Sequence, residues 1–369
     1  MEALILSCKT GGGHNAAALA LRRALEERGH SVTLLDPYTL TGTDALVGGA
    51  YVRTVQTSPK VFGFVYYLGN QVRKIPLKSP VYAANFHVAR QLGDYLRAHP
   101  ADVVFMTHLF PAEMLTRLKR KHFPLPPTVF ISTDYVCIPF TEETECDYYI
   151  VPCRDALPDC IARGIPERKL LPLGIPVDKA FSSPLSREEA VRELGYRPEL
   201  RYVLLCGGSM GSGHLEAVAH KLAQRMETDP QLALIAVCGS RQELYARMAA
   251  RYRGNDRVTV LPTTDRMPLL LRCASVYMTK PGGLSSTEAA VAGTALVHLS
   301  PIPGCETRNM AYFSQTGMSL ALDRPEEQVL DALDRLAQPG VAEEMIRAQR
   351  AHIPHDAAEA IAKFAEELA

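Results

Sequence analysis

Several glycine-rich turns in this chain follow short apolar runs and set reactive side chains beside bare backbone amides. The first is SCKTGGGHNAAALAL (residues 7–21), in which His14 directly follows three glycines. From Gly11 to Ala16 the turn spells G-x-G-x-x-A, and Asp36 comes about twenty residues later, the pattern of a dinucleotide-binding turn. Taken alone, this turn predicts an NAD- or flavin-dependent enzyme.

The most informative turn lies in TKPGGLSSTEAAVAGTALVHLSPIPGCETRN (279–309). An expected strand ends at Lys280, and Gly282 and Gly283 then bring main-chain N–H groups to the start of an expected helix. Bare amides and the positive end of the helix dipole form an anion site suited to a diphosphate. Glu288, one turn into the helix, can grip two vicinal hydroxyls such as those of a ribose. Three hydroxyl groups add donors: Ser285, Ser286 and Thr287.

Two further stretches offer polar groups next to glycines. In PIPGCETRN (301–309), Glu306 and Asn309 share one expected helical face and can hydrogen-bond sugar hydroxyls. CGGSMGSGH (206–214) follows an expected strand and suits the close approach of a phosphate or a sugar. Each pattern alone also fits a glycine-capped turn or a capped surface helix.

Composition limits the classes of protein to which the chain can belong. Hydrophobic residues make up 47% and charged residues 22% of its 369 residues, as in ordinary globular proteins. The 40 basic and 40 acidic residues balance, so no overall field favours nucleic acid. The apolar run in MEALILSCKT is too short for a signal peptide, and no uncharged apolar stretch reaches about 18 residues, the length of a membrane span. We therefore expect a cytoplasmic protein.

The nine cysteines predict neither a metal site nor disulfides. Cys146, Cys153 and Cys160 recur every seven residues, but no C-x-x-C pair accompanies them, as it does in most zinc sites. An odd number of cysteines in a chain without a signal peptide fits reduced thiols. Four more lie in or beside apolar runs, where a buried thiol acts as a small hydrophobe: Cys8, Cys206, Cys238 and Cys273.

Short apolar runs alternate with helical patterns along the chain, which predicts an α/β fold with β-α-β units around parallel sheets. Strands are expected at 3–8, 31–37, 102–108, 128–134, 147–152, 202–208, 232–239, 258–262, 275–282, 295–299 and 318–322. The pattern restarts after a proline-rich stretch, which indicates two doubly wound domains in series. We expect a first domain over 1–175, a linker over 176–200, a second domain over 201–350 and a last helix over 351–369 that can pack back on the first domain.

Taken together, the motifs resemble those of a known family. GGGHNAAA, STDY followed by CDYYIVP, LCGGSMGSG, VCGSRQEL, TKPGGLSSTEA and PIPGCETRN follow one another along the chain. They resemble the motifs of the monogalactosyldiacylglycerol synthases and processive diacylglycerol glucosyltransferases, relatives of the N-acetylglucosaminyltransferase of peptidoglycan synthesis. The resemblance covers nearly the whole chain.

The resemblance implies a GT-B fold, in which two Rossmann-like domains face each other across a cleft. The carboxyl-terminal domain would hold a UDP-sugar, and the amino-terminal domain would hold the acceptor. The resemblance implies that no cofactor or metal ion is needed. In agreement, the sequence contains no D-x-D pair for a metal–diphosphate clamp. Matching positions assign these residues to the donor: Gly208, Ser209, Gly211, Gly282, Gly283, Leu284, Ser285, Glu288, Glu306 and Asn309.

On the acceptor side, the resemblance implies that the first glycine turn faces the acceptor rather than a dinucleotide. His14 would be the general base, since an unperturbed histidine pKa of about 6.5 suits taking a proton from an attacking hydroxyl. Asp134 is the second catalytic candidate, because it could orient the base or the acceptor. These positions also suit helix caps. The candidates for binding the acceptor are Gly12, Gly13 and His108.

The leading hypothesis is an inverting glycosyltransferase that moves a hexose from a UDP-hexose to a membrane lipid such as diacylglycerol, giving a β-glycolipid. Several alternatives stay open. The same donor could serve a soluble small-molecule acceptor, or the chain could be a UDP-sugar epimerase, an NAD-dependent oxidoreductase or a nucleotide-sugar-binding protein without catalysis. The identity of the hexose is also open.

A basic and aromatic stretch between Asp44 and Asp94 contains no acidic residue. Cations attract anionic headgroups, and aromatic rings favour the membrane interface. We therefore expect peripheral binding to the anionic inner face of the cell membrane; the alternative is that the aromatic side chains belong to the core. The candidate membrane residues are Phe64, Tyr66, Arg73, Lys74 and Lys78.

Overall fold

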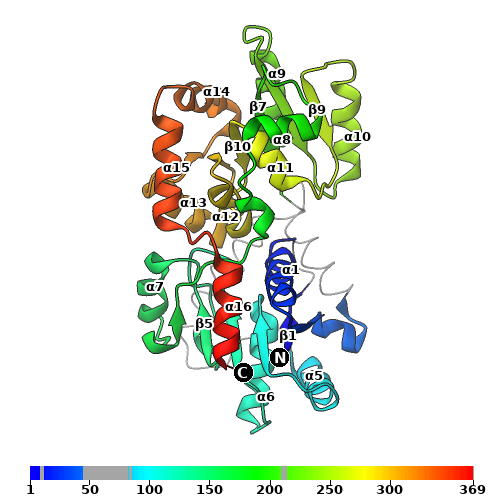
Figure 1. Ribbon diagram of the computed structural model, residues 1–369, viewed down its shortest axis with the longest axis vertical. Coiled ribbons are helices and arrows are strands. Elements are labelled where there is room, and N and C mark those ends of the chain that lie inside the picture. The colour runs from blue at the N-terminus through cyan, green and yellow to red at the C-terminus, as the bar shows by residue number, and fades with distance from the viewer. Residues whose placement is uncertain (9–11, 45–81, 83–84, 209–213, 369) are drawn as a thin grey trace. The chain divides into compact units, whose positions relative to one another are not determined.

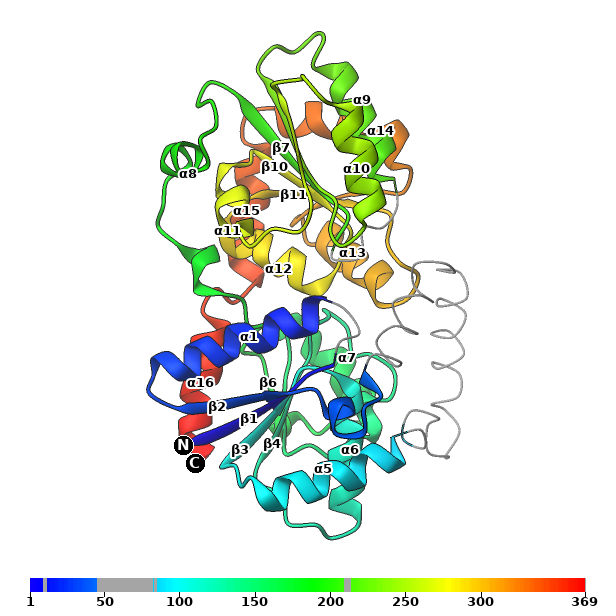
Figure 2. The same cartoon turned by 90° about the vertical axis from the view of Figure 1, so that its right-hand side faces the viewer.

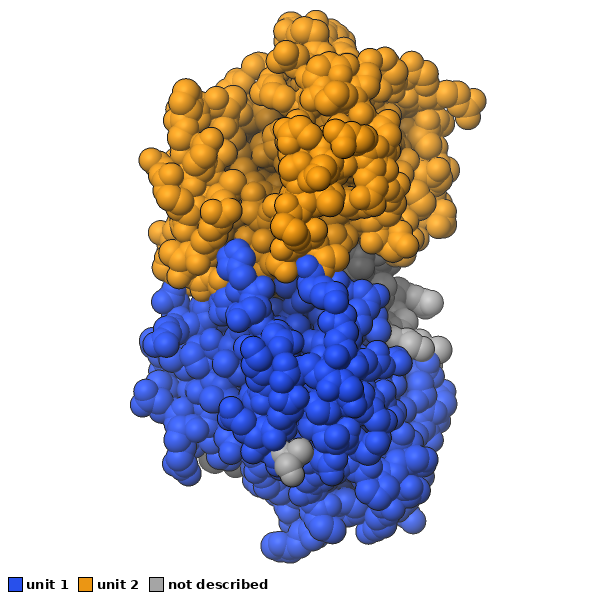
Figure 3. All heavy atoms as spheres, in the orientation of Figure 1, with its two compact units in different colours: residues 1–179, 303–305, 354–369 blue, residues 180–302, 306–353 orange. Residues whose placement is uncertain are grey.

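The computed structural model describes residues 1–8, 12–44, 82, 85–208 and 214–368 (Figure 1). The chain divides into two compact units, which Figure 3 colours separately. Unit 1 comprises residues 1–179, 303–305 and 354–369, and unit 2 comprises residues 180–302 and 306–353. The last residues of the chain therefore belong to the same unit as the first.

Unit 1 is built on a parallel sheet whose six described strands have the order β2-β1-β3-β4-β5-β6. Figure 2 shows α1 and α16 on one face of this sheet and α5 and α6 on the other. The strands are β1 (Glu2–Leu6), β2 (Ser31–Leu35), β3 (Val103–Met106), β4 (Thr128–Ile131), β5 (Tyr148–Ile150) and β6 (Leu170–Leu171). The helices are α1 (Gly12–Glu27), α5 (Phe86–Ala98), α6 (Leu109–Arg120), α7 (Leu157–Ala162) and α16 (Ala357–Leu368).

The core of unit 1 follows from the apolar patterns of its sequence. In β1, Ile5 pairs in register with Leu34 of β2 and Phe105 of β3, and the strand is apolar at successive positions because helices cover both faces. Helix α1 turns Leu21 and Leu25, spaced by about one turn, into the same cluster. Burial of these side chains is what holds the helix against the sheet.

Helix α16 completes the core of unit 1 from the far end of the chain. Its residues Ile361, Ala362 and Ala365 are fully buried among the side chains of α1 and the sheet. At its rim, Arg28, which directly follows α1, pairs with Glu366 and with a second carboxylate of α16. Because this helix fills the apolar stripe of α1, unit 1 requires the carboxyl-terminal residues for a closed core.

Unit 2 is built on a second parallel sheet, with six described strands in the order β12-β11-β10-β7-β8-β9. Figure 2 shows α9, α10 and α14 on one side of it and α11, α12 and α15 on the other. The strands are β7 (Arg201–Cys206), β8 (Leu232–Val237), β9 (Val258–Leu261), β10 (Val276–Thr279), β11 (Ala295–Leu299) and β12 (Leu320–Leu322). The helices are α8 (Arg187–Leu194), α9 (Leu215–Arg225), α10 (Gln242–Arg251), α11 (Met267–Cys273), α12 (Gly283–Ala292), α13 (Cys305–Gln315), α14 (Pro325–Leu336) and α15 (Val341–His352).

Each sheet has a point at which the direction of winding reverses. In unit 1 the chain runs from β1 to its neighbour β2 and later returns to the other side of β1 with β3. In unit 2 it runs from β7 through β8 and β9 and then returns beside β7 with β10. Ligands of open parallel sheets bind at the carboxyl ends of the strands at such points. The fold therefore offers one candidate site per unit.

The fold class predicted from the sequence, two doubly wound α/β domains, is confirmed by the two parallel sheets. The stretch expected as a linker, 176–200, contains the helix α8. A capping box between Ser186 and Glu189 begins this helix, Gly195 ends it, and α8 packs against α11 in unit 2. In the part of the chain that the structure describes, no helix has the length and apolar character needed to cross a membrane.

Candidate active site

The candidate site of unit 1 lies where β1 and β3 end, and His14 is its central side chain. Helix α1 begins at Gly12, and its first turn is tied to the end of β1 by a 2.6 Å hydrogen bond from Ser7 Oγ to Asn15 Oδ1. From this turn the imidazole of His14 reaches the end of β3, where its Nδ1 lies 2.7 Å from the carbonyl oxygen of Thr107. The predicted base therefore stands at the reversal point of the sheet.

The contact with Thr107 determines which nitrogen of His14 can act as a base. A carbonyl oxygen only accepts hydrogen bonds, so Nδ1 must carry the proton and donate it. The hydroxyl of Thr133, at the end of β4, lies 3.0 Å from the same nitrogen. In the neutral ring the unprotonated nitrogen is consequently Nε2, the atom that can accept a proton from a substrate hydroxyl.

The surroundings of His14 favour its neutral form. Burial lowers its pKa below the ordinary value, and the negative charge of Asp134 and the bond to Thr107 oppose that shift only in part. The ring of His108 meets the ring of His14 edge to face, with 4.6 Å between centroids. Burial and the neighbouring His14 together lower the pKa of His108 well below its usual range, so this residue is neutral as well.

The structure places the acceptor-side candidates from the sequence in the same region of unit 1. His14 and His108 are in contact, and Asp134 directly follows Thr133 after the end of β4, close enough for its charge to act on His14. His108 also caps α6, because its Nδ1 accepts a hydrogen bond from Phe110 N at 3.1 Å. Gly12 and Gly13 form the first turn of α1 just before His14, Gly12 exposed and Gly13 half-buried.

The candidate site of unit 2 lies where β7 and β10 end. After β10 the chain passes Lys280 and turns at Gly282, the N-cap of α12, into the helix that begins at Gly283. The first amides of a helix have no partner within it, so they are free to bind an anion. Leu284 in this turn is buried, whereas Ser285 is half-buried and keeps contact with solvent.

Two of the three hydroxyls expected as ligand donors serve the helix instead. Ser286 Oγ donates to the carbonyl of Gly282 at 2.8 Å, and Thr287 Oγ1 donates to the carbonyl of Gly283 at 2.8 Å. Both side chains are fully buried. The expectation that Ser286 and Thr287 face a diphosphate is therefore wrong, because short hydroxyl side chains inside a helix satisfy themselves on the preceding turn.

Glu288 lies one turn further along α12 and is half-buried. Its charge reaches the end of β7: burial raises the pKa of the Cys206 thiol to about 12, and the carboxylate of Glu288 adds to the rise. The carboxylate of Glu288 thus lies near enough to the end of β7 for its charge to act on Cys206. This position suits a group that accepts hydrogen bonds from a diol.

The remaining donor-side candidates meet at the start of α13. Glu306 forms an ion pair with Lys280, and its second oxygen accepts a 2.9 Å hydrogen bond from Ile302 N. Asn309 is fully buried and donates from Nδ2 to the carbonyl of Pro281 at 3.2 Å. Both side chains therefore contact the residues just before the Gly282 turn, although the two residues are remote from it in the sequence.

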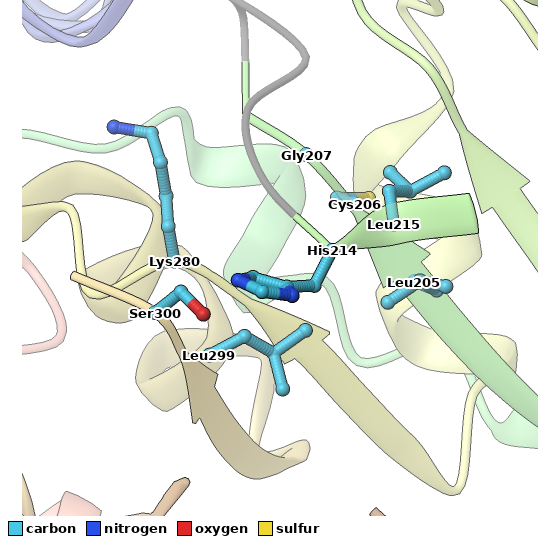
Figure 4. A pocket seen from close by; sticks show the side chains of 8 residues that line it. All are labelled: Leu205, Cys206, Gly207, His214, Leu215, Lys280, Leu299 and Ser300. Carbon is cyan, nitrogen blue, oxygen red and sulfur yellow. The ribbon is translucent and has the colours of Figure 1, made fainter. Parts of the chain in front are cut away.

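A small hollow opens at the ends of β7, β10 and β11. Figure 4 shows the side chains of His214, Leu299 and Ser300 turned toward one another in it, with Lys280 standing at its edge. His214 Nδ1 lies 2.7 Å from Glu326 Oε1, which orients the imidazole. The residues that line the hollow are Leu205, Cys206, Gly207, His214, Leu215, Lys280, Leu299 and Ser300.

Family models match both halves of the chain. Residues 14–177 match the model described as monogalactosyldiacylglycerol (MGDG) synthase, and residues 202–367 match the C-terminal domain of glycosyltransferase family 28. The chain thus combines a domain of the monogalactosyldiacylglycerol synthase family with a C-terminal domain of glycosyltransferase family 28. The resemblance inferred from the motifs is thereby confirmed.

Among relatives of this family, a processive diacylglycerol beta-glucosyltransferase of Staphylococcus aureus (strain MRSA252) is 24% identical over 269 residues. The match covers 72% of this chain and 66% of that relative, just under two thirds of its length.

Solved structures with the same fold include MurG of Acinetobacter baumannii, with a TM-score of 0.62, 17% identity and 99% coverage of both chains. A UDP-GlcNAc 2-epimerase from Neisseria meningitidis bound to UDP-GlcNAc also has a TM-score of 0.62, at 10% identity and 100% coverage of both chains.

Sequence reasoning missed two polar residues of the site in this family member, Lys280 and His214. Lys280 was noted only as the end of a strand, although a lysine two residues before a double glycine at an anion site was a usable signal. His214 gave no signal of its own, because its partner Glu326 is remote in sequence.

Some predicted site residues cannot be placed. On the donor side these are Ser209 and Gly211, and among the membrane candidates they are Phe64, Tyr66, Arg73, Lys74 and Lys78, all of which lie outside the described residues. Within the described ranges, no group of three or more His, Cys, Asp or Glu side chains is arranged to hold a metal ion.

Proposed function

We propose that the protein is an inverting glycosyltransferase that transfers a hexose from a UDP-hexose to the hydroxyl of a membrane lipid such as diacylglycerol. The observation that carries this proposal is the turn from Lys280 to Gly283, which sets a cation and helix amides at the reversal point of the second sheet. The two family-model matches and the printed name of the Staphylococcus aureus relative support glycosyl transfer to a diacylglycerol-type acceptor, and the Neisseria meningitidis structural neighbour is bound to a UDP-sugar.

In the proposed reaction, the acceptor oxygen forms a bond to the anomeric carbon as the bond from that carbon to the β-phosphate oxygen breaks. UDP leaves with the electron pair of the broken bond, and Nε2 of His14 takes the proton of the acceptor hydroxyl. Attack from the side opposite the leaving group inverts the configuration, so an α-linked UDP-hexose gives a β-glycoside.

We propose that unit 2 supplies the groups that hold the donor. The helix amides after Gly282 and the half-buried Ser285 face the diphosphate, and Glu288 accepts hydrogen bonds from the ribose diol. Glu306 serves the hexose, whereas the buried Asn309, expected from the sequence to contact the sugar, supports the turn through the carbonyl of Pro281. Since Lys280 and the helix dipole already supply positive charge to the diphosphate, we expect turnover without a metal ion or cofactor and unchanged activity in the presence of EDTA.

A panel of ligands tests the donor. We expect UDP and UDP-hexoses to raise the melting temperature, and GDP-sugars, dTDP-sugars and NAD to leave it nearly unchanged. Incubation with each UDP-hexose and diacylglycerol then separates the candidate functions. A glycolipid product supports the proposal, whereas a changed sugar nucleotide without an acceptor product would indicate the epimerase activity of the Neisseria meningitidis structural neighbour. A product formed only with soluble acceptors would reject the lipid acceptor.

Substitution of Glu288 tests how the donor is held. Glu288→Ala should weaken UDP binding by about 1–3 kcal/mol, because the ribose loses charge-assisted hydrogen bonds. Glu343→Ala, which removes an exposed carboxylate from α15, is the matched control and should leave UDP affinity unchanged. Isothermal titration with UDP measures both. A folded Glu288→Ala variant with wild-type UDP affinity would remove Glu288 from the site.

We also propose that the enzyme binds peripherally to the anionic inner face of the membrane. The basic and aromatic stretch between Asp44 and Asp94 supports this, and its last part is described. Phe86 is 50% exposed, and the guanidinium carbon of Arg117 and the ammonium of Lys121 lie 4.3 Å and 5.2 Å from the centre of its ring. An exposed ring held among cations is suited to the lipid–water interface.

A further inference from the structure

The ion pair between Lys280 and Glu306 is largely buried at the amino-terminal end of a helix. Its side chains are only 14% and 9% exposed, and it lies beside the N-cap of α12, where a bare anion site is expected. Two charges removed from water lose much of their solvation, so such a pair is seldom kept for stability alone. Its position at the donor turn calls for a functional explanation.

The backbone around Lys280 is shaped to hold its side chain in this place. Gly208, after β7, has a positive φ of 70°, and a Cβ built on it would lie 2.5 Å from Cε of Lys280. The aliphatic stem of the lysine therefore runs against bare backbone. At its end, a Cβ on Gly282 would lie 3.8 Å from Nζ of Lys280 and 3.9 Å from Oε1 of Glu306. The pair thus sits against the turn itself.

The two charges of the pair have opposite effects on the binding of the proposed diphosphate ligand. A diphosphate at the Gly282 turn is attracted by the ammonium of Lys280 and repelled by the carboxylate of Glu306. The two anions compete for one cation. The carboxylate of Glu306 loses little free energy on separation from Lys280 only if other hydrogen-bond donors replace the ammonium. The hydroxyls of a hexose are such hydrogen-bond donors. Its second oxygen keeps the amide of Ile302 in either case.

We infer that the Lys280–Glu306 ion pair is exchanged when a UDP-hexose binds. The ammonium of Lys280 passes from Glu306 to the diphosphate, and the carboxylate of Glu306 passes to hydroxyls of the hexose. This inference rests on the proposed function and makes Lys280 a donor-binding residue. Because only the intact donor supplies both partners, the exchange lets the site distinguish a UDP-hexose from UDP.

Neutralising each partner separately tests the exchange, because the two changes have opposite effects on UDP. Lys280→Met should weaken UDP binding about 10- to 100-fold while uridine binding stays within about twofold, since only the diphosphate loses its cation. Glu306→Gln keeps the length of the side chain and an acceptor for Ile302 N. It should strengthen UDP binding about 3- to 10-fold, because the competing anion is gone. In the same variant the ratio of the affinity for UDP-hexose to the affinity for UDP should fall to about one.

Two further variants keep the test decisive. Lys280→Arg retains the cation and should hold UDP affinity within about threefold of the wild type. Gly208→Ala displaces the stem of Lys280 and should weaken UDP binding as Lys280→Met does, even if the latter variant fails to fold. Asp334→Asn neutralises an exposed partner of Arg225 elsewhere in unit 2 and is the matched control, with unchanged affinity for every ligand.

The outcomes separate this inference from the proposed function. If the wild type binds UDP and Glu306→Gln weakens that binding as Lys280→Met does, the pair is a fixed structural element and the exchange is overturned. Wild-type UDP affinity in both Lys280→Met and Gly208→Ala would also overturn it. If the wild type binds no uridine nucleotide, the proposed function fails and the exchange fails with it.

Discussion

His14 gains its proposed chemistry from atoms that belong to other elements of unit 1. The carbonyl of Thr107, at the end of β3, fixes the proton on Nδ1, and burial keeps the ring neutral. An isolated histidine in water would exchange between tautomers and would be partly charged near neutral pH. Here the fold prepares a single basic nitrogen, Nε2, before any substrate is present.

Removal of the His14 side chain should separate turnover from donor binding. We expect His14→Ala to lower turnover about 10²- to 10⁴-fold, the usual contribution of a general base, while UDP affinity stays unchanged because the donor is held by unit 2. Single-turnover rates with a UDP-hexose and diacylglycerol, together with UDP titrations, measure the two effects. Near-normal turnover in this variant would place the base elsewhere and make Asp134 the next candidate.

The pH dependence of kcat/KM should report the environment of His14. The base is active when neutral, so activity is lost as the pH falls through its pKa, which burial lowers below the ordinary value of about 6.5. The negative charge of Asp134 opposes that shift, so Asp134→Asn should move the acid limb to still lower pH. Profiles of both proteins between pH 4 and 8 give the comparison. A limb that moves to higher pH in the variant would show that this limb does not belong to His14.

At the scale of elements, α12 shows how burial constrains the donor site. His298 of β11 is fully buried between Ser286 of α12 and Ser319, with 2.9 Å from Nε2 to the first hydroxyl and 3.0 Å from Nδ1 to the second. Ser286 gives its proton to the carbonyl of Gly282, so it accepts from Nε2–H, and Ser319 then donates to Nδ1. Every partner is satisfied while the ring is neutral.

This arrangement should make the protein less stable in acid. Burial lowers the pKa of His298 to about 3, below the value of about 6.5 in an unfolded chain. Between these values the unfolded chain binds a proton that the folded protein does not, so the free energy of unfolding falls as the pH drops from 6.5 toward 3, by up to about 1.4 kcal/mol per pH unit from this residue. Urea unfolding at pH 7, 6 and 5 measures the slope.

The variant His298→Gln isolates that contribution. Glutamine offers a donor and an acceptor but does not titrate, so the slope should be reduced relative to the wild type. His99→Gln, at an exposed position, is the control and should keep the wild-type slope. If wild type and His298→Gln lose stability in parallel, the buried histidine is not the source of the pH dependence.

The same elements show what could be predicted from the sequence and why the rest could not. Buried parallel strands are continuous apolar runs bounded by glycine and polar residues, so the sequence predicted the strands around the two glycine turns. It did not predict β6, which has only two residues and lies in a proline-rich stretch. Glycine turns also located the N-cap at Gly282. Lys280 lies between β10 and α12, and its partner lies 26 positions away on α13, so no local pattern encodes such a pair.

At the scale of the whole molecule, the order of the chain does not match the order of its units. The chain builds unit 1, then unit 2, and the last helix returns to unit 1, where Ile361 and Ala362 fill the core against α1. The proposed base therefore belongs to unit 1, and the proposed donor-binding residues belong to unit 2. The proposed membrane contact belongs to unit 1 together with His14, so the lipid acceptor and the base are assigned to the same unit.

The last prediction concerns that membrane contact. Six basic residues and no acidic residue occur between Asp44 and Asp94, and cations near a bilayer contribute roughly 1 kcal/mol each toward anionic headgroups. We expect the protein to sediment with vesicles that contain anionic lipid at low salt. Binding should weaken as salt is raised, because exposed charges are screened within about 10 Å at 0.1 M ionic strength.

Charge reversal tests which residues carry this binding. The triple variant Arg73→Glu, Lys74→Glu and Lys78→Glu should abolish sedimentation with anionic vesicles, while UDP affinity stays unchanged. Reversal of three exposed arginines of unit 2 provides the matched control, which should still bind: Arg192→Glu, Arg335→Glu and Arg347→Glu. Failure of the wild type to sediment with anionic vesicles at low salt would remove the physical support for membrane docking. A soluble acceptor would then fit the proposed glycosyltransferase activity better, because a lipid hydroxyl reaches His14 only if unit 1 approaches the bilayer.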